Sequence, residues 1–357
     1  MTVLQVCAYG AEYSGNFIAS LEALEAALKR KGIDTIYAFV GRAADKDWCK
    51  QIQKRTKVYF LPEAKARILP KTYQAFRKIY KENDIGIVHS HFELYDIPAT
   101  VMAPKSVKIF WHLHDPLAKH KGLRELLWNV QYGVVGKRAT LLSVAEKYRD
   151  DVVSMGFPKK QTHFLPNSIN LGRVHTNRQA GPKEYQFLTF GWDFFRKGDD
   201  LILQACDRLE QDGYTFRLLL NGNEKTWPQL KEYLRDREPG YLTTGNPVED
   251  INELFEASEL FIQASRRETF SYAVCEAAYA GLPVICSDIP GLEWAHALPS
   301  VEFFEAENAD HLYTLMKNWL DKKNIDIQAI SQTQRTIEEY YSLRVWVDKV
   351  MKYYGVT

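Results

Sequence analysis

Apolar runs of strand length alternate with amphipathic segments of helix length along most of the chain. Short apolar runs bounded by polar residues, Gly or Pro are typical of buried parallel strands, and apolar residues three or four apart indicate helices. The expected strands lie near residues 2–8, 34–40, 57–60, 85–89, 107–112, 139–144, 162–165, 186–190, 215–220, 240–243, 259–263, 283–286 and 301–304. The expected helices lie near residues 15–31, 71–82, 122–136, 146–155, 198–212, 226–236, 249–256, 270–280, 308–320 and 332–353. This alternation predicts an α/β fold.

The strands fall into two series, which indicates two domains. The segment between the series, NLGRVHTNRQAGPK, is polar, carries Gly and Pro, and has neither a helix nor a strand period. We therefore expect a first domain at residues 1–170, a linker at 171–183 and a second domain at 184–335. Each domain should be a Rossmann-like, doubly wound parallel sheet, with ligands bound in a cleft at the carboxyl ends of the two sheets.

Composition narrows the class of protein. The chain has 357 residues, of which 46% are hydrophobic, and this excludes disordered, collagenous and disulfide-stapled proteins. Its five scattered cysteines include no C-x-x-C pair, so we expect buried thiols in a reducing compartment. No segment approaches the apolar length of about 18 residues that a membrane span needs, and the N-terminus begins as a strand rather than a signal peptide. We therefore expect a cytoplasmic protein.

Charge is divided unequally between the two halves. Residues 1–170 hold 26 Lys and Arg against 16 Asp and Glu, a net charge of +10, whereas residues 171–357 hold 20 against 29, a net charge of −9. The basic half is suited to an anionic partner such as a membrane surface, a phosphorylated substrate or nucleic acid. Electrostatic complementarity between the two halves is the other interpretation, and charge alone leaves both open.

A glycine-bounded loop follows the first expected strand. It runs from Tyr9 to Asn16 and contains Gly10, Ser14 and Gly15 before a helix, where glycines allow a tight turn and helix N–H groups can meet an anion. The loop lacks the G-x-G-x-x-G spacing, so a nicotinamide or flavin site of the usual form is not supported.

Two carboxylates stand out near the expected strand at 259–263. Glu268 lies in the loop after this strand, and Glu276 lies in a helix of otherwise small and apolar residues. Since an unpaired carboxylate is costly to bury, a functional role is favoured over a solvated helix position. Glu268 is expected to precede the helix, so that both carboxylates lie at the mouth of the sheet.

A second candidate segment follows the expected strand at 186–190. Gly191 and Trp192 open a loop that leads to Arg196, Lys197 and a helix. Two adjacent cations beside free helix N–H groups form a plausible diphosphate clamp, although a solvated basic pair would have the same local sequence.

In combination these segments resemble the family 4 retaining glycosyltransferases with the GT-B fold. Gly191–Gly198 resembles their G-R-L-x-x-x-K-G element, Glu268–Glu276 their E-x(7)-E element, and Ser287–Glu293 their S-D-x-x-G-x-x-E loop. Pro166–Asn170 resembles their P-N-G-V-D element. The elements occur in the family's order over residues 3–300 or so, which is far more specific than any one of them.

The resemblance implies roles for the residues at these positions. Lys197 would hold the diphosphate, Glu276 the ribose hydroxyls, and Glu268 the hydroxyls of the donor sugar. Asn246, Pro247 and Val248 resemble the loop that contacts the base. The donor site would also include Gly191, Trp192, Thr269, Phe270 and Ser271. Catalysis is expected from Glu268, Lys197, Arg196 and His114, on a UDP- or GDP-linked hexose, with no metal and no cofactor.

The resemblance also implies an architecture and an acceptor. Residues 336–357 would form a helix that crosses back to the first domain, which would bind a glycan, lipid-linked or other hydroxyl acceptor. Such enzymes commonly serve the synthesis of cell-surface polysaccharides and glycoconjugates.

Two departures from the family pattern keep alternatives open. Trp192 stands where the family has Arg, and Ser168 stands where it has Gly. Arg196 is the available substitute cation. A non-catalytic partner subunit of GT-B shape, or a sugar-nucleotide epimerase or phosphorylase of similar fold, are the alternatives.

Four histidines lie near two expected strand ends, in His89-Ser90-His91 and His112-Leu113-His114. His114, beside Asp115, is the stronger candidate to bond a sugar hydroxyl, and His91 is grouped with the Gly10–Gly15 loop as an acceptor or phosphate site. A zinc site is weakly supported, because the i, i+2 spacing on a strand fixes no third ligand.

The basic residues of the first half concentrate at residues 46–82, which hold 11 Lys and Arg. Tyr73, Phe76 and Tyr80 recur there at helical spacing, as in an interfacial membrane helix or, more often, a helix packed on a core. No nucleic-acid-binding module accompanies the charge. We therefore expect no nucleic-acid partner, and an anionic membrane surface remains one open interpretation of the basic half, with the protein then peripheral to that membrane.

Overall fold

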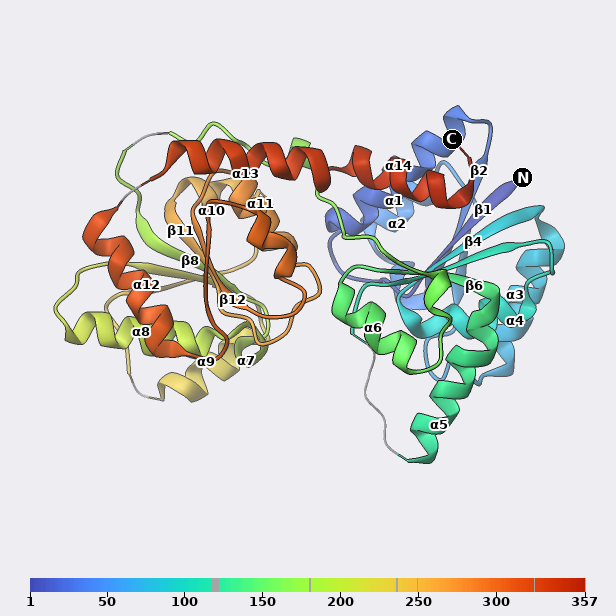
Figure 1. The fold of residues 1–357 in the computed structure, drawn as a ribbon, viewed down its shortest axis with the longest axis horizontal. Coiled ribbons are helices and arrows are strands. Elements are labelled where there is room, and N and C mark those ends of the chain that lie inside the picture. The colour runs from blue at the N-terminus through green and yellow to red at the C-terminus, as the bar shows by residue number, and fades with distance from the viewer. Residues whose placement is uncertain (117–121, 180, 236, 249, 324, 357) are drawn as a thin grey trace. The chain divides into compact units, whose positions relative to one another are not determined.

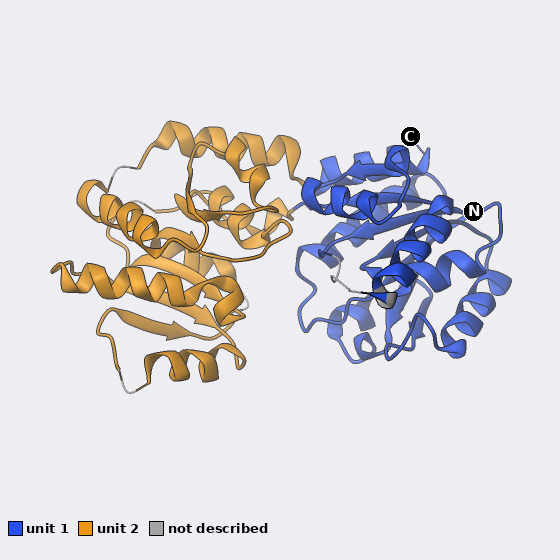
Figure 2. Ribbon diagram, turned by 60° about the horizontal axis from the view of Figure 1, so that its bottom comes forward, with its two compact units in different colours: residues 1–168, 343–357 blue, residues 169–342 orange. Residues whose placement is uncertain are grey.

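The computed structural model describes residues 1–116, 122–179, 181–235, 237–248, 250–323 and 325–356. The chain divides into two compact units, Met1–Ser168 with Leu343–Thr357 and Ile169–Ser342 (Figure 2). Each unit is a parallel sheet with helices packed on both faces (Figure 1). The expected fold of two doubly wound α/β domains is therefore confirmed.

The sheet of unit 1 has seven parallel strands in the order β3-β2-β1-β4-β5-β6-β7. All seven lie where the apolar runs predicted them. Their bounds are β1 Thr2–Cys7, β2 Asp34–Val40, β3 Val58–Leu61, β4 Ile85–His91, β5 Lys108–Leu113, β6 Ala139–Ser143 and β7 Thr162–Phe164. The chain passes from β1 outward to β3 and then returns to β4 beside β1, so the order of the strands reverses between β1 and β4.

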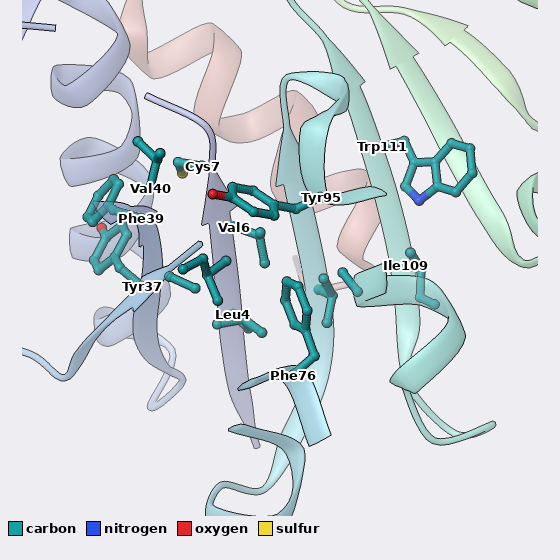
Figure 3. Packing of buried hydrophobic residues seen from close by; sticks show 14 of the residues in the cluster. Leu4, Val6, Cys7, Tyr37, Phe39, Val40, Phe76, Tyr95, Ile109 and Trp111 are labelled. Carbon is teal, nitrogen blue, oxygen red and sulfur yellow. The ribbon is translucent and has the colours of Figure 1, made fainter. Parts of the chain in front are cut away.

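Two hydrophobic layers enclose this sheet. Its helices are α1 Gly15–Arg30, α2 Asp47–Gln53, α3 Pro70–Glu82, α4 Asp96–Met102, α5 Leu123–Val130, α6 Glu146–Ser154 and α14 Leu343–Tyr354. Helices α1 and α14 lie side by side, and both pack against a cluster that includes Val3 and Phe110 (Figure 1). Leu4 and Val6 alternate with Val3 along β1 and pack with Phe76 of α3 in the other cluster (Figure 3).

In unit 1 the pattern of apolar residues did not predict two short helices, and it predicted a third helix longer than the α-helix observed. Helices α2 and α4 span seven residues each, which is too short for an amphipathic period to be visible. The helix expected at 122–136 is α-helical only over Leu123–Val130 and continues as a π-helical segment, Gln131–Val135.

The sheet of unit 2 has six parallel strands in the order β10-β9-β8-β11-β12-β13. Their bounds are β8 Tyr185–Gly191, β9 Leu218–Gly222, β10 Leu242–Gly245, β11 Ser258–Gln263, β12 Val284–Asp288 and β13 Val301–Glu305. The helices are α7 Phe194–Lys197, α8 Asp199–Gln211, α9 Thr226–Leu234, α10 Ile251–Glu256, α11 Tyr272–Tyr279, α12 Ala309–Lys322 and α13 Ile327–Tyr340. Residue 249, where the helix expected at 249–256 was to begin, lies outside the described residues.

The single long helix expected at 332–353 was wrong, because the chain breaks it into α13 and α14. At the break, the backbone N–H of Ile169 donates to the carbonyl oxygen of Tyr341 at 2.8 Å, and Ser342 forms a β-bridge with Ile169. The Tyr341 ring also packs on Trp294, with ring centroids 4.8 Å apart. These contacts hold Tyr341 and Ser342 in unit 2, whereas α14 belongs to unit 1.

The segment expected as a linker, residues 171–183, lies within unit 2. The Arg178 guanidinium donates to the carbonyl oxygen of Gly281 at 3.2 Å, and the Asn252 side chain donates to the carbonyl oxygen of Arg173 at 2.8 Å. The division between units instead falls at Ser168, and again at Ser342.

The aromatic residues of helix α3 pack against the core of unit 1. Phe76 is fully buried, and the Tyr73 and Tyr80 hydroxyls donate to the carbonyl oxygens of Arg67 and Ala99. The aromatic stripe is therefore a core contact, as the more frequent alternative had it. The basic side chains of the helix remain exposed, namely Lys71, Arg77, Lys78 and Lys81.

The five cysteines, Cys7, Cys49, Cys206, Cys275 and Cys286, are buried and unpaired, as expected. Within the described residues, no helix combines the length and apolarity that crossing a bilayer requires.

The carboxyl group of Asp96, at the start of α4, is enclosed in unit 1. Its side chain is 1% exposed, Ser90 Oγ donates to Oδ1 at 2.5 Å, and Oδ2 has no hydrogen-bond partner among the described residues. Burial raises the pKa of Asp96 to about 8, against the weaker opposing effect of the Ser90 hydrogen bond. The folded protein therefore keeps this carboxyl protonated at neutral pH.

We expect Asp96→Asn to remove a pH dependence of stability. An unfolded Asp loses its proton near pH 3.9, whereas folded Asp96 keeps it to about pH 8, so the free energy of unfolding falls as pH rises between these values. The neutral Asn has no such slope, and the stability of the variant relative to wild type should rise by a few kcal/mol from pH 5 to pH 8. Urea unfolding at both pH values measures this.

The matched control is Asp34→Asn, at an exposed position of the same sheet. Its difference from wild type should not change between the two pH values. Parallel pH profiles for Asp96→Asn and wild type would contradict the assignment of a protonated carboxyl.

Candidate functional site

The candidate site of unit 2 lies where its strand order reverses. Strands β8 and β11 are neighbours, but the chain leaves β8 for β9 and β10 before it returns to β11. Segments that follow two neighbouring strands at such a reversal turn in opposite directions, and doubly wound sheets bind their ligands at this carboxyl edge. Lys197 follows β8 and Glu268 follows β11, so this topology brings two segments 71 residues apart to one point.

An ion pair joins these two segments. Lys197 Nζ donates to Glu268 Oε1 at 2.5 Å, and Ser265 Oγ donates to the same oxygen at 2.8 Å. The side chains of Lys197 and Glu268 are 12% and 9% exposed. Because so little solvent reaches the pair, its attraction is screened weakly and its geometry is well defined.

Arg196 lies beside this pair but faces solvent. Its side chain is 43% exposed, and its Nη1 lies 3.9 Å from Glu268 Oε1. Its Nε donates to Asp193 Oδ2 at 3.2 Å. The site thus combines one enclosed cation, Lys197, with one accessible cation, Arg196, as two ligands for a diphosphate would require.

Glycines at two positions allow the loop after β8 to pack closely. Gly198 has φ = +71°, and a Cβ atom there would lie 1.9 Å from the carbonyl oxygen of Ala264. A Cβ atom on Gly191 would lie 2.3 Å from Asp199 Oδ2. Only glycine at position 198 satisfies both the left-handed conformation and the contact with the end of β11. The G-x(6)-G spacing of this segment therefore has a steric cause.

A salt bridge that the sequence analysis missed holds the two loops together. Arg266 donates from Nη1 and Nη2 to the two carboxylate oxygens of Asp200, at 2.8 Å each. The backbone N–H of Arg266 also donates to the carbonyl oxygen of Arg196 at 2.9 Å. This bidentate pair fixes the loop after β11 against α7 and α8. The complementary Arg266-Arg267 and Asp199-Asp200 pairs were the signal that could have revealed it.

The loop after β12 supports the backbone of Glu268 and of the residues that follow it. Gly291 has φ = +92°, and a Cβ atom there would lie 2.2 Å from the carbonyl oxygen of Glu268. Trp294 stacks on Phe270 and donates from Nε1 to its carbonyl oxygen at 2.7 Å. Trp294 was not predicted as a site residue, but it positions the segment from Glu268 to Ser271, including Thr269.

Glu268 precedes α11 and Glu276 lies within it, as expected. Ser271 adopts φ = +57° and accepts a hydrogen bond from the backbone N–H of Val274 at 3.4 Å, which caps the helix. The Glu276 side chain is 5% exposed. Its burial agrees with the argument that this carboxylate has a specific role rather than a solvated one.

The expected base-contacting loop follows β10 on the same edge of the sheet. Asn221, at the end of β9, donates to the carbonyl oxygen of Asn246 at 2.6 Å, and Trp227 Nε1 donates to Asn246 Oδ1 at 3.3 Å. The adjacent residues Pro247 and Val248 are partly exposed and exposed. Trp192, after β8, is 41% exposed. All the donor-site candidates thus follow strands of one sheet at their carboxyl ends.

In unit 1 the glycine-bounded loop follows β1, at the point where that sheet also reverses its strand order. Gly15 begins α1 with φ = +55°, and Ser14 before it is exposed. A Cβ atom on Gly10 would lie 2.6 Å from the Arg42 side chain, which itself pairs with Glu63. The loop lies next to the end of β4, because β1 and β4 are hydrogen-bonded neighbours.

His91 and His114 belong to a buried network rather than to an open surface. Their side chains are 0% and 6% exposed, and His91 Nδ1 lies 3.0 Å from His114 Nε2. His114 Nδ1 lies 3.1 Å from Asn167 Oδ1, so both ring nitrogens of His114 are engaged. Burial lowers the pKa of His114 to about 3. To bond a sugar hydroxyl, His114 would have to exchange one of these partners, and that role stays a prediction.

Comparison with protein families gives a match over most of both units. Residues 19–173 match the model described as Glycosyltransferase Family 4, and residues 185–321 match the model described as Glycosyl transferases group 1. Most strands of both sheets lie within these two ranges, and every candidate donor-site residue lies within the second.

The individual relatives share limited sequence identity with this chain. An alpha-galactosylglucosyldiacylglycerol synthase of Streptococcus pneumoniae is 22% identical over 62% of this chain and 58% of its own length. The lipopolysaccharide glucosyltransferase WaaG of Escherichia coli is 30% identical over 39% of this chain and 36% of its own. The chain thus spans less than two thirds of the curated relatives that it matches. Among solved structures, Anabaena Alr3699/HepE in complex with UDP has a TM-score of 0.80 at 12% identity, covering 100% of both chains.

We expect Gly198→Ala to destabilise unit 2 and disturb the candidate site. Alanine strains the left-handed backbone by about 1–2 kcal/mol and also forces a Cβ atom against the carbonyl oxygen of Ala264. The matched control is Gly213→Ala, beyond the other end of α8, where φ is +86° and no atom lies within 4 Å of the added Cβ. Urea unfolding should show a loss for Gly198→Ala at least twice that of the control. Equal losses would contradict the close contact.

Proposed function

The chain belongs to the family 4 glycosyltransferases with the GT-B fold, and we propose that it transfers a hexose from a nucleoside diphosphate to a hydroxyl acceptor with retention of anomeric configuration. UDP and GDP are the proposed leaving groups. The relatives named for lipid and lipopolysaccharide glycosylation support an acceptor of a cell-surface glycoconjugate or polysaccharide.

The observation that carries this proposal is the pair of Lys197 and Glu268 at the reversal of the second sheet. Lys197 ends the short helix α7 after β8, Glu268 lies in the loop after β11, and Lys197 Nζ lies 2.5 Å from Glu268 Oε1. A nucleotide sugar presents an anionic diphosphate beside a neutral, hydroxyl-rich sugar. A lysine next to a hydrogen-bond-accepting carboxylate matches these two chemical neighbours in the substrate.

The proposed reaction exchanges one C–O bond for another at the anomeric carbon. The bond from this carbon to the diphosphate oxygen breaks, and its electron pair leaves with the nucleoside diphosphate. A bond to the acceptor oxygen forms on the same face, and the acceptor proton passes to the departing phosphate oxygen. Lys197 and Arg196 would stabilise the charge that develops on this leaving group, which is the largest electrostatic demand of the step.

The remaining donor contacts are proposed for the same edge of the sheet. Glu276 would accept hydrogen bonds from the ribose hydroxyls, and Glu268 from hydroxyls of the donor sugar. The backbone of Asn246, Pro247 and Val248 would contact the base. The reaction is proposed to need no resident metal or cofactor, because fixed side-chain cations hold the diphosphate.

Lys197→Ala should lower kcat by about 100-fold with a smaller change in donor KM, because the cation matters most when charge develops on the leaving diphosphate. Initial rates of transfer or donor hydrolysis with UDP- and GDP-hexoses measure this. The matched control is Lys183→Ala. Lys183 precedes β8, its side chain is 13% exposed, and its Nζ pairs with Glu256 Oε1 at 2.6 Å. That variant should keep the wild-type rate.

Calorimetric titration with UDP and GDP distinguishes the proposal from its alternatives. A chain that binds neither nucleotide and hydrolyses no donor would be a non-catalytic subunit. That outcome would agree with Trp192 standing where the family has Arg. A Lys197→Ala variant with wild-type kcat would show that the leaving group is stabilised elsewhere.

The basic surface of α3 is proposed to face an anionic membrane that carries the acceptor. Exposed Lys and Arg near such a surface contribute about 1 kcal/mol each, and salt screens them. Replacing the four exposed basic residues of α3 with Gln should therefore release the chain from anionic vesicles and leave UDP or GDP binding unchanged. The four are Lys71, Arg77, Lys78 and Lys81.

A second variant with four exposed basic residues of unit 2 replaced by Gln controls for net charge. These residues are Lys225, Lys231, Lys322 and Arg335. It should sediment with anionic vesicles like wild type at low salt. Equal sedimentation of wild type with anionic and neutral vesicles would overturn the membrane proposal.

A further inference from the structure

Four histidines lie together on one face of the sheet of unit 1. His89 and His91 alternate along β4, and His112 and His114 lie at and beyond the end of β5. The two strands are paired with His91 opposite His112. Side chains two residues apart on a strand share a face, so all four imidazoles project to the same side of the sheet. Helices α1 and α14 pack over this face.

Part of this cluster is buried without well-formed hydrogen bonds. His89 and His112 are 0% exposed. In the part of the chain that the structure describes, Nε2 of His89 has no hydrogen-bond partner, and neither nitrogen of His112 has one with good geometry, although the backbone of Leu165 interacts with the His112 ring. A buried polar atom without a well-formed hydrogen bond costs about 1–3 kcal/mol, so three of them in one place call for an occupant.

The strand register supplies the third ligand that the sequence could not fix. One ring nitrogen from each of His89, His91 and His112 lies within 4.8 Å of the other two. The i, i+2 spacing on β4 provides only two of these nitrogens, and β5 adds the third across the ladder. Three neighbouring imidazoles are a donor set that suits divalent zinc, nickel, copper or iron.

The surrounding hydrogen bonds orient these rings as outer partners of metal-bound histidines do. The Tyr354 hydroxyl lies 2.7 Å from His89 Nδ1 and leaves Nε2 directed elsewhere. Gln5 Oε1 lies 2.9 Å from His91 Nε2, and the Gln5 side chain donates to Tyr354 at 3.2 Å. Ligation by His91 would replace one of its present bonds. Such second contacts fix the tautomer and orientation of a ligating ring.

We propose that His89, His91 and His112 bind one zinc ion between the sheet and α14. Tyr354 of α14 would link the occupied site to the C-terminal helix through His89. This proposal does not depend on the proposed function, because its three histidines lie in unit 1 and the candidate donor site lies in unit 2.

The enclosure of the site determines how it must be loaded. Trp346 of α14 stacks on His112 with ring planes 14° apart, and the three rings are fully buried. A metal ion would therefore enter while the chain folds rather than by soaking. The test accordingly uses the full chain expressed in zinc-supplemented medium and freed of loosely held metal by gel filtration in a chelator.

We expect wild type to retain about one zinc per chain by elemental analysis. His112→Leu and His89→Leu should each retain at least tenfold less. The matched control is His163→Leu, on β7 of the same sheet, where the ring packs on Tyr353 of α14. This control should retain zinc like wild type.

Thermal melting gives an independent readout. If zinc occupies the site, His112→Leu loses a ligand and should melt below wild type. If the site holds no metal, the same substitution removes two buried nitrogens that lack well-formed hydrogen bonds and should melt at or above wild type. A metal-free wild type, or equal zinc in all variants, would overturn the proposal.

Should the leucine variants fail to fold, cobalt decides the question on wild type. Protein expressed with Co²⁺ should show visible ligand-field absorption without a thiolate charge-transfer band, because the ligands are imidazoles. No retained cobalt, or a thiolate band, would contradict the site.

Discussion

The buried ion pair of Lys197 and Glu268 determines how the rest of unit 2 must be built. Two charges that are removed from water are stabilised only if each is held against its partner, and loss of either would leave the other unpaired. The Arg266–Asp200 bridge fixes the segments that carry them, and Gly198 allows these two segments to approach within a backbone contact. Gly291 allows the loop after β12 to approach the backbone of Glu268 in the same way. The reversal of strand order between β8 and β11 is what brings the two loops together.

Both units use the same topology for different chemistry. In unit 2 the reversal point gathers ionisable groups with limited access to solvent, which suits a charged ligand. In unit 1 the strands at the reversal point, together with β5, carry Gln5 and the histidines beneath α14. Helix α14 thereby joins the C-terminal segment of the chain to the core of the first unit through Trp346 and Tyr354.

The sequence predicted the strands well because buried parallel strands are nearly continuous apolar runs. It also placed Glu268 and Glu276 at the mouth of the second sheet and Lys197 in a segment after β8, and of these the structure brings Lys197 and Glu268 into contact. It missed the break at Tyr341, because the cause is a backbone bond to Ile169, which is distant in sequence. It did not predict that Trp294 supports the segment after Glu268, or that His112 joins His89 and His91. These two features depend on loop packing and strand register, which also involve residues that are distant in sequence.

The most direct test of this account is a crystal structure of the full chain with UDP or GDP bound. We predict that the diphosphate lies within hydrogen-bond reach of Lys197 at the carboxyl ends of β8 and β11. The ribose should contact Glu276. A nucleotide bound elsewhere in unit 2, or bound in unit 1, would contradict the assignment of the donor site.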